Sequence, residues 1–196
     1  MRFARLFLFA IATLFAGHAL AADAPGPKVL IQTSMGDIVL QLDPAHAPLT
    51  VANFLRYVRE GHFDDTIVYR VVPGFVIQAG SWQADLQTRP VHDPVPLEAN
   101  NGLSNVRGAV AMAHGAPDSA TAEFFVDLAD NVTLDHSATD TGNTTGFAVF
   151  GQVVQGMDVV DKIAAVPLGD HGPFLGSAPV TPVTIAKVTV LPDAAP

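Results

Sequence analysis

The chain of 196 residues contains no cysteine, which excludes a disulfide framework, a thiolate metal site and a thiol nucleophile. Basic residues are also scarce, since 10 lysines and arginines stand against 19 acidic residues and the formal net charge is −9. This balance argues against sequence-independent nucleic-acid binding, in which Lys and Arg neutralise phosphates. The histidines show no H-x-x-x-H or similar ligand spacing, so we expect neither a metal ion nor another cofactor.

Long apolar runs are missing after the N-terminal region. There, two arginines precede an apolar run at 6–16, and residues 19–21 supply the small-x-small pattern that signal peptidase accepts. A membrane-spanning helix needs roughly 20 apolar residues, and a glycine and a histidine interrupt this run early. We therefore expect residues 1–21 to be a cleaved signal peptide. Residues 22–196 are expected to form one exported domain, located in the periplasm and free of any membrane segment.

Short β-branched and aromatic runs, separated by turn residues, make up most of the remaining chain. The strands predicted from them lie at 28–33, 38–42, 66–72, 75–78, 109–113, 124–128, 147–154 and 183–190. Two amphipathic helices are also expected, one between an N-cap at Thr50 and Gly61, and one at 157–165. Because no βαβ alternation occurs, the pattern favours a mainly β fold with an antiparallel sheet closed into a barrel.

The stretch YRVVPGFVIQAG, residues 69–80, places an arginine and a glutamine in an otherwise apolar strand. On a regularly alternating strand, Arg70 would point away from its neighbours Tyr69 and Val71 and reach a surface groove. Taken alone, such an arginine is more often a solvated residue on the outer face of a sheet. Its surroundings change that interpretation, because R-x-x-P-G-F-x-x-Q-x-G is followed further along by M-A and then F-F.

This order of motifs resembles the cyclophilin family of peptidyl-prolyl cis/trans isomerases, and the similarity extends over nearly the whole chain after the expected signal peptide. EANNGLSNVRGAVAMA and FAVFGQVVQGMDVVDKI are similar to the exported bacterial branch. The resemblance implies a closed eight-stranded antiparallel β-barrel capped by two α-helices. It also implies an enzyme that rotates Xaa-Pro bonds in exported proteins and so assists periplasmic folding.

The resemblance further implies a set of site residues. Arg70, Phe75 and Gln78 match the catalytic arginine, the aromatic wall of the proline pocket and the amide that holds the substrate backbone. The implied substrate-binding residues are Val76, Ala113, His114, Glu123, Phe125, Leu134 and Phe147. A guanidinium donor fits the chemistry, because the prolyl nitrogen lone pair becomes an acceptor only in the twisted transition state.

Four positions depart from the family pattern: Thr133, Phe147, Val76 and Glu123. Thr133 stands where the family has a large aromatic residue on which cyclosporin rests, so we expect weak cyclosporin binding. Glu123 replaces a glutamine, and we expect it either to pair with Arg70 or to favour basic residues in the substrate.

The partners expected on this interpretation are proline-containing, unfolded or partly folded exported polypeptides, and the protein is expected to be a monomer. One alternative is a chaperone or adaptor that binds proline peptides with little turnover. Another is an unrelated barrel that binds small molecules. The sequential residues Asp135, His136 and Ser137 do not predict a hydrolase triad, because triad partners come together from separate segments.

Overall fold

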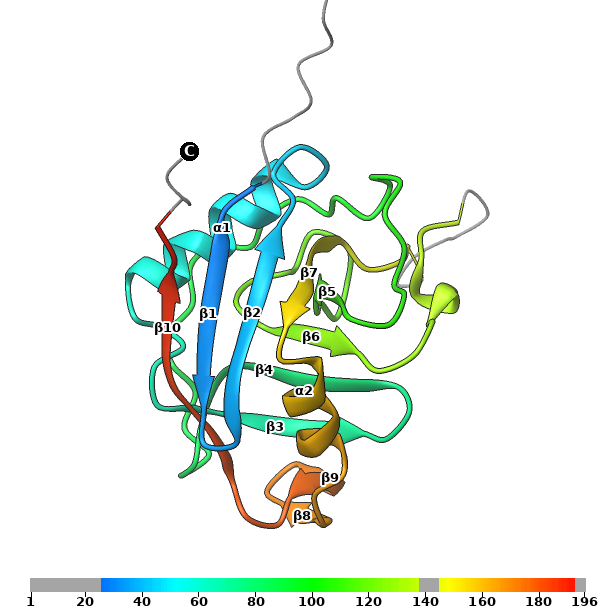
Figure 1. Cartoon of the computed structure of the whole chain (residues 1–196). Coiled ribbons are helices and arrows are strands. Elements are labelled where there is room, and N and C mark those ends of the chain that lie inside the picture. The colour runs from blue at the N-terminus through cyan, green and yellow to red at the C-terminus, as the bar shows by residue number, and fades with distance from the viewer. Residues whose placement is uncertain (1–25, 138–144, 193–196) are drawn as a thin grey trace, which may run out of the picture.

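The computed structural model describes residues 26–137 and 145–192, and the predicted signal peptide lies outside these residues. Eight strands close into an antiparallel barrel in the order β1-β10-β3-β4-β6-β5-β7-β2 (Figure 1). They are β1 (Lys28–Thr33), β2 (Gly36–Leu42), β3 (Thr66–Val72), β4 (Val76–Gln83), β5 (Ala109–Met112), β6 (Phe124–Asp127), β7 (Val149–Gln155) and β10 (Val183–Val190). Each corresponds to a predicted strand, so the barrel prediction is confirmed.

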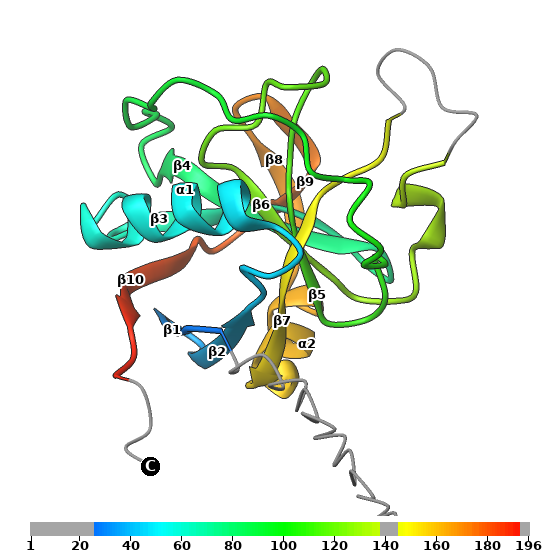
Figure 2. The ribbon, with the colours of Figure 1, turned by 90° about the horizontal axis from the view of Figure 1, so that it is seen from above.

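Two α-helices, α1 (Pro48–Arg59) and α2 (Met157–Ala164), pack against the barrel and lie apart from one another (Figure 2). Helix α2 contacts β2, β3 and β4. The ring of Phe54 in α1 lies 5.4 Å from that of Phe124 and 5.0 Å from that of Phe150, both in barrel strands. Val160 and Ile163 of α2 are fully buried in the same core. No helix in the described part of the chain has the length and apolar character needed to cross a membrane.

The start of α1 differs from the prediction. The helix begins at Pro48, whose missing N–H and fixed φ suit a first helical position, so Thr50 lies in the first turn rather than at the cap. The Glu98 carboxylate accepts hydrogen bonds from the backbone N–H of Leu49 at 3.1 Å and of Thr50 at 2.8 Å. This cap comes from a distant loop, so local sequence did not indicate it. The predicted end is confirmed, because Gly61 follows the helix with a φ of 68°.

Strands β8 (Leu168–His171) and β9 (Phe174–Pro179) form a two-stranded antiparallel sheet that the sequence did not predict. The segment is interrupted by glycine and proline, which obscures the alternation of a strand. The Phe174 ring lies 4.7 Å from that of Tyr69 in β3 and 4.9 Å from that of Trp82 in β4. The small sheet therefore covers the outside of the barrel at β3 and β4.

Strand β3 does not alternate regularly at Tyr69. Its pairing with β4 shifts register between Val68 and Arg70, so Tyr69 is the extra residue of a β-bulge. Val68 and Val71 belong to the barrel core, whereas Tyr69 is buried outside that core, under β9. The prediction that Tyr69 and Val71 share a side was wrong, because the bulge turns Tyr69 outward together with Arg70.

Candidate active site

A cavity of about 180 Å³ opens on the outer side of the barrel where β3, β4 and β6 meet the segment after β5 and the segment before β7. It is lined by Arg70, Phe75, Val76, Gln78, Ala113, His114, Phe125, Leu134 and Phe147. Every residue of this lining was predicted from the sequence to belong to the site. Six separate segments contribute to it, so the barrel brings together residues that are far apart in the chain.

Arg70 and Gln78 form the polar side of the cavity. The two residues are partners across the β3–β4 ladder, and Arg70 Nη1 donates a hydrogen bond of 3.1 Å to Gln78 Oε1. The guanidinium is half-buried, and this bond restricts its orientation. Because arginine stays protonated at any physiological pH, the cavity contains a positioned, permanently charged donor.

Aromatic and aliphatic side chains form the other side. Val76 and Phe125 are buried in a small hydrophobic cluster, separate from the barrel core, and Phe75, Leu134 and Phe147 pack against this cluster. The rings of Phe125 and Phe147 meet edge to face, with centroids 5.5 Å apart and planes at 81°. An apolar pocket therefore lies beside the guanidinium, where low polarisability strengthens electrostatic contacts.

The backbone of Phe75 is fixed from behind. Its carbonyl accepts hydrogen bonds from the Leu128 N–H at 2.8 Å and from Asn131 Nδ2 at 2.9 Å. Asn131 Nδ2 also donates to Asp127 Oδ1 at 2.7 Å. Neither Asn131 nor Asp127 was identified from the sequence. The one available signal was the carboxyl group of Asp127 within the apolar run FFVDL.

Asp127 is an acidic residue with no solvent exposure, 0% of its surface being accessible. Burial raises the pKa of Asp127 to about 7, although the hydrogen bond from Asn131 opposes the shift. Its second oxygen, Oδ2, has no hydrogen-bond partner among the described residues. The wall of the pocket is thus supported by a carboxyl group that titrates near neutral pH.

The rim is built around His114, Leu134 and Phe147. His114 Nε2 donates to the Gly146 carbonyl at 2.8 Å, and its ring lies 4.6 Å from that of Phe147. Leu134, in the short 3₁₀ helix η1 (Val132–Leu134), accepts a hydrogen bond of 2.9 Å from the Phe147 N–H. These contacts lie on either side of residues 137–146, most of which are outside the described residues.

Asp135 does not pair with its neighbour His136. Its carboxylate accepts hydrogen bonds from Ser104 Oγ at 2.5 Å and from the Asn105 N–H at 2.7 Å. Partial burial opposes ionisation, but the donors of Asn105 and Ser104 outweigh it and lower the pKa of Asp135. His136 instead places Nδ1 3.2 Å from the Thr145 carbonyl oxygen. Asp135 and His136 thus bind different partners and do not form the hydrogen-bonded relay of a hydrolase.

Glu123 is the one predicted site residue that does not line the cavity. Its Oε1 accepts the Ser81 N–H at 2.8 Å, and the described residues show no ion pair between Glu123 and Arg70. Of the two alternatives expected for Glu123, the pairing with Arg70 is therefore not formed in the described part of the chain. The carboxylate lies over Gly80, where an added Cβ would be 2.3 Å from Oε2. Burial raises the pKa of Glu123, against the effect of its hydrogen bonds from Ser81 and Tyr69.

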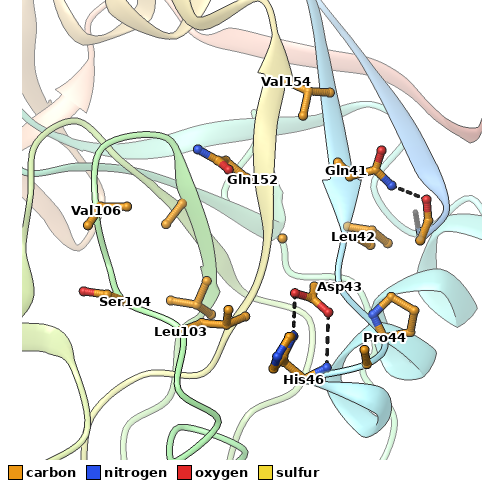
Figure 3. A pocket seen from close by; sticks show the side chains of 15 residues that line it. Gln41, Leu42, Asp43, Pro44, His46, Leu103, Ser104, Val106, Gln152 and Val154 are labelled. Carbon is orange, nitrogen blue, oxygen red and sulfur yellow. Dashed lines mark hydrogen bonds and ion pairs between the residues drawn. The ribbon is translucent and has the colours of Figure 1, made fainter. Parts of the chain in front are cut away.

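A larger hollow, of about 490 Å³, lies between the end of β2, β7 and the loop before β5 (Figure 3). Asp43 and His46 are the charged or titratable side chains in its described lining. They satisfy one another, because Asp43 accepts the His46 N–H at 3.1 Å and its Oδ2 lies 2.8 Å from His46 Nδ1 (Figure 3). The smaller cavity, with a charged donor beside an apolar pocket, is therefore the candidate active site.

Comparison with known proteins agrees with this geometry. The chain matches the family described as cyclophilin type peptidyl-prolyl cis-trans isomerase over residues 28–190. It is 42% identical over 171 residues to peptidyl-prolyl cis-trans isomerase A of Dickeya dadantii, which covers 87% of each chain. It is 45% identical over 163 residues to peptidyl-prolyl cis-trans isomerase B of Escherichia coli, covering 83% of this chain and 98% of that one.

Solved structures support the fold independently. A cyclophilin type isomerase of Cryptosporidium parvum superposes with a TM-score of 0.69 at 19% identity, covering 86% of this chain and 99% of that one. The barrel, the lining of its outer cavity and the similarity along the sequence lead to one assignment. This chain belongs to the cyclophilin-type peptidyl-prolyl cis-trans isomerase family.

Proposed function

We propose that this cyclophilin-type isomerase acts on Xaa-Pro bonds of exported polypeptides in the periplasm, with Arg70 as the catalytic donor. One observation carries the catalytic part: the Arg70 guanidinium is held by Gln78 at 3.1 Å and lines the same cavity as Phe75 and Phe125. A proline ring in the apolar part of the cavity would present its nitrogen to the guanidinium.

The proposed chemistry needs no nucleophile. Rotation about a peptide bond has a barrier of ~18–20 kcal/mol, because the nitrogen lone pair is delocalised into the carbonyl group. In the twisted transition state the lone pair is localised on the prolyl nitrogen and accepts a hydrogen bond. A fixed donor then binds the twisted state better than either planar state, which is the condition for a faster rate. Each ~1.36 kcal/mol of this difference gives a tenfold acceleration.

The remaining predicted residues have binding roles in this proposal. Phe75 and Phe125 hold the pyrrolidine ring while the carbonyl end rotates, and Ala113 and His114 hold the backbone before proline. The family binds proline-containing peptides, and the Cryptosporidium parvum cyclophilin was also solved in the presence of the dipeptide Ala-Pro. A short proline peptide is therefore a suitable first substrate.

The cellular location in this proposal rests on the N-terminal sequence. The basic start, the apolar run and the small-x-small pattern at 19–21 support export with cleavage. Cell fractionation and N-terminal sequencing of the recovered protein test this part separately. A protein that keeps residues 1–21 and stays in the cytoplasm would contradict it. Closure of the barrel supports a monomer, because the eight barrel strands themselves have no unpaired edge for association.

An exchange assay by NMR on an Ala-Pro peptide tests the role of Arg70. We expect Arg70→Ala to lose most of the rate, while circular dichroism shows an intact fold. Arg59→Ala is the matched control, because Arg59 is an exposed arginine at the end of α1, outside the cavity lining. If Arg70→Ala isomerises the peptide as fast as the parent, the proposed role of Arg70 is wrong.

A further inference from the structure

The β-bulge in β3 determines the side of the strand on which Arg70 lies. Val68 and Val71 both belong to the barrel core, although two residues stand between them. Regular alternation from Val68 would therefore turn Arg70 inward, away from the cavity that it lines. The extra residue Tyr69, inserted where the ladder shifts register, places Arg70 on the outer side instead. The donor proposed for catalysis thus depends on a local irregularity of its strand.

The bulge is packed from outside the ladder, where its extra residue has no partner on the opposite strand. Tyr69 is only 4% exposed, and its ring lies 4.7 Å from that of Phe174 in β9 and 6.0 Å from that of Trp82 in β4. Phe174 and Trp82 also meet each other edge to face, with centroids 4.9 Å apart and planes at 85°. The three rings form one cluster on the outside of the barrel.

Phe174 is the member of this cluster that does not come from a barrel strand. It is the first residue of β9 and pairs with His171 of β8 across the two-stranded sheet. This sheet lies beside β3 (Figure 1). Phe174 is not among the residues that line the cavity. An effect of Phe174 on catalysis would therefore pass through β3.

We propose that Phe174 is a positioning residue: by packing on Tyr69 it keeps the β3 bulge in place and so holds the Arg70 guanidinium at the cavity. The hydrogen bond of 3.1 Å to Gln78 restricts the guanidinium itself, whereas Phe174 restricts the backbone that carries it. This inference rests on the role proposed above for Arg70. It gives the β8–β9 sheet a function in the reaction as well as in covering the barrel.

Loss of the Phe174 ring should release the bulge. Tyr69 would then be exposed, and the extra residue would no longer be confined to one position in the strand. A one-residue shift of pairing moves a side chain to the other face of a sheet, so Arg70 would point away from the cavity for part of the time. The rate should fall with the fraction of molecules that keep Arg70 in place. The apolar wall formed by Phe75 and Phe125 remains, so binding of the proline ring should change little.

Kinetics of Phe174→Ala in the whole protein test the proposal on an Ala-Pro peptide. We expect kcat to fall by about twofold to tenfold, the range for one aromatic contact, with KM changed by less than about twofold. In the Arg70→Ala background the same substitution should not lower the residual rate further, because it acts through Arg70. Phe174→Leu keeps an apolar cover without the ring, so we expect a smaller loss of kcat. It takes the place of the alanine variant if that variant does not fold.

NMR observes the position of Arg70 directly. The Nε–H signal of Arg70, recorded below neutral pH, is identified by its loss in Arg70→Ala. In Phe174→Ala without substrate, we expect this signal to shift or broaden, because the guanidinium then has more than one environment. A purely structural role of Phe174 would lower the thermal midpoint and leave the Arg70 signal unchanged.

Two controls separate positioning from general stability. Leu175 follows Phe174 in β9 but is 73% exposed, so Leu175→Ala should change neither kcat nor the Arg70 signal. Val58 of α1 is buried in the barrel core and does not line the cavity. Val58→Ala is therefore expected to lower the thermal midpoint without lowering kcat.

Four results would overturn the proposal. They are a parental kcat in Phe174→Ala (or in Phe174→Leu, if the alanine variant does not fold), an unchanged Arg70 signal, a loss of equal size in the Arg70→Ala background, and an equal loss of kcat in Val58→Ala. Failure of this inference is distinct from failure of the proposed function. If Arg70→Ala is slow and Phe174→Ala is not, only this inference fails. If Arg70→Ala is as fast as the parent, the proposed role of Arg70 fails whatever Phe174 does.

Discussion

Asn131 and Asp127 meet directly behind the pocket wall, with Asn131 Nδ2 2.7 Å from Asp127 Oδ1 and 2.9 Å from the Phe75 carbonyl oxygen. One amide group therefore connects a buried carboxyl group to the backbone of Phe75, an aromatic residue that lines the cavity. The backbone carbonyl of the same asparagine accepts a hydrogen bond of 2.8 Å from the Leu134 N–H, so Asn131 also supports the rim. The stability and the shape of the pocket are coupled through this pair.

Asp127 should make the stability of the protein depend on pH. Burial raises the pKa of Asp127 to about 7 in the folded state from an ordinary value of 3.8. The folded state thus holds its proton more tightly, so the free energy of unfolding falls as the pH rises from about 4 towards 7 and levels off above. Asp127→Asn removes this dependence. At pH 8 the free energy of unfolding of the variant should exceed that of the parent by about 1–3 kcal/mol, because the parent then holds a buried charged group without a full set of partners.

Urea unfolding of the parent and of Asp127→Asn across this pH range checks the prediction. The two curves of unfolding free energy against pH should lie close together near pH 4 and diverge as the pH rises. Parallel curves over the whole range would show that Asp127 ionises normally. With parallel curves, neither burial nor the hydrogen bond from Asn131 would have a measurable effect on the pKa of Asp127.

Asn131→Ala should weaken both the fold and the pocket. The substitution removes the donor to the Phe75 carbonyl and leaves Asp127 without its partner, which should cost about 1–3 kcal/mol of stability. We expect KM for a proline peptide to rise, because the wall at Phe75 is less well held. Asn53→Ala is the matched control, since Asn53 Nδ2 donates to the Thr121 carbonyl at 2.6 Å on another side of the molecule. Equal KM values for the two variants would contradict the positioning of Phe75 by Asn131.

Thr133 should determine the response to cyclosporin. It is exposed in η1, one residue before the rim residue Leu134, and presents no aromatic surface. We expect weak inhibition of the parent, and Thr133→Trp should improve the inhibition constant by up to about tenfold, because an aromatic contact adds ~0.5–1.5 kcal/mol. Val132→Trp is the control, since Val132 is an exposed neighbour in the same short helix. Sub-micromolar inhibition of the parent would show that the rim binds cyclosporin without the aromatic residue.

The barrel and the cavity lining were predictable because both leave local marks in the sequence. Each barrel strand has its own apolar run, and the lining residues Arg70, Phe75, Gln78 and Phe125 occur in motifs with fixed spacing. The site roles of these residues were predicted from the resemblance of those motifs to the cyclophilin family. The sequence was therefore sufficient for the architecture and, through that resemblance, for the lining of the candidate active site.

The details that were missed depend on contacts between distant segments. The cap of α1 comes from Glu98, and the direction of Glu123 depends on the Ser81 N–H across the ladder. A one-residue bulge turns the Tyr69 side chain to the outside of the barrel. There it is covered by β9, a strand whose sequence shows little alternation of apolar and polar residues. Such features follow from the tertiary structure, since neither propensity nor periodicity encodes which loop or strand lies next to a given residue.

We propose that Arg70 favours the twisted peptide bond over its planar forms, and separate kcat and KM values of Arg70→Ala and Arg70→Lys distinguish this role from simple substrate binding. We expect Arg70→Ala to lower kcat by about tenfold or more with KM nearly unchanged, because the apolar pocket still binds the ground state. Arg70→Lys should recover little of the loss, since an ammonium group is not a planar fork held by Gln78. A raised KM with parental kcat in Arg70→Ala would show that Arg70 only binds substrate and that the proposed catalytic role is wrong.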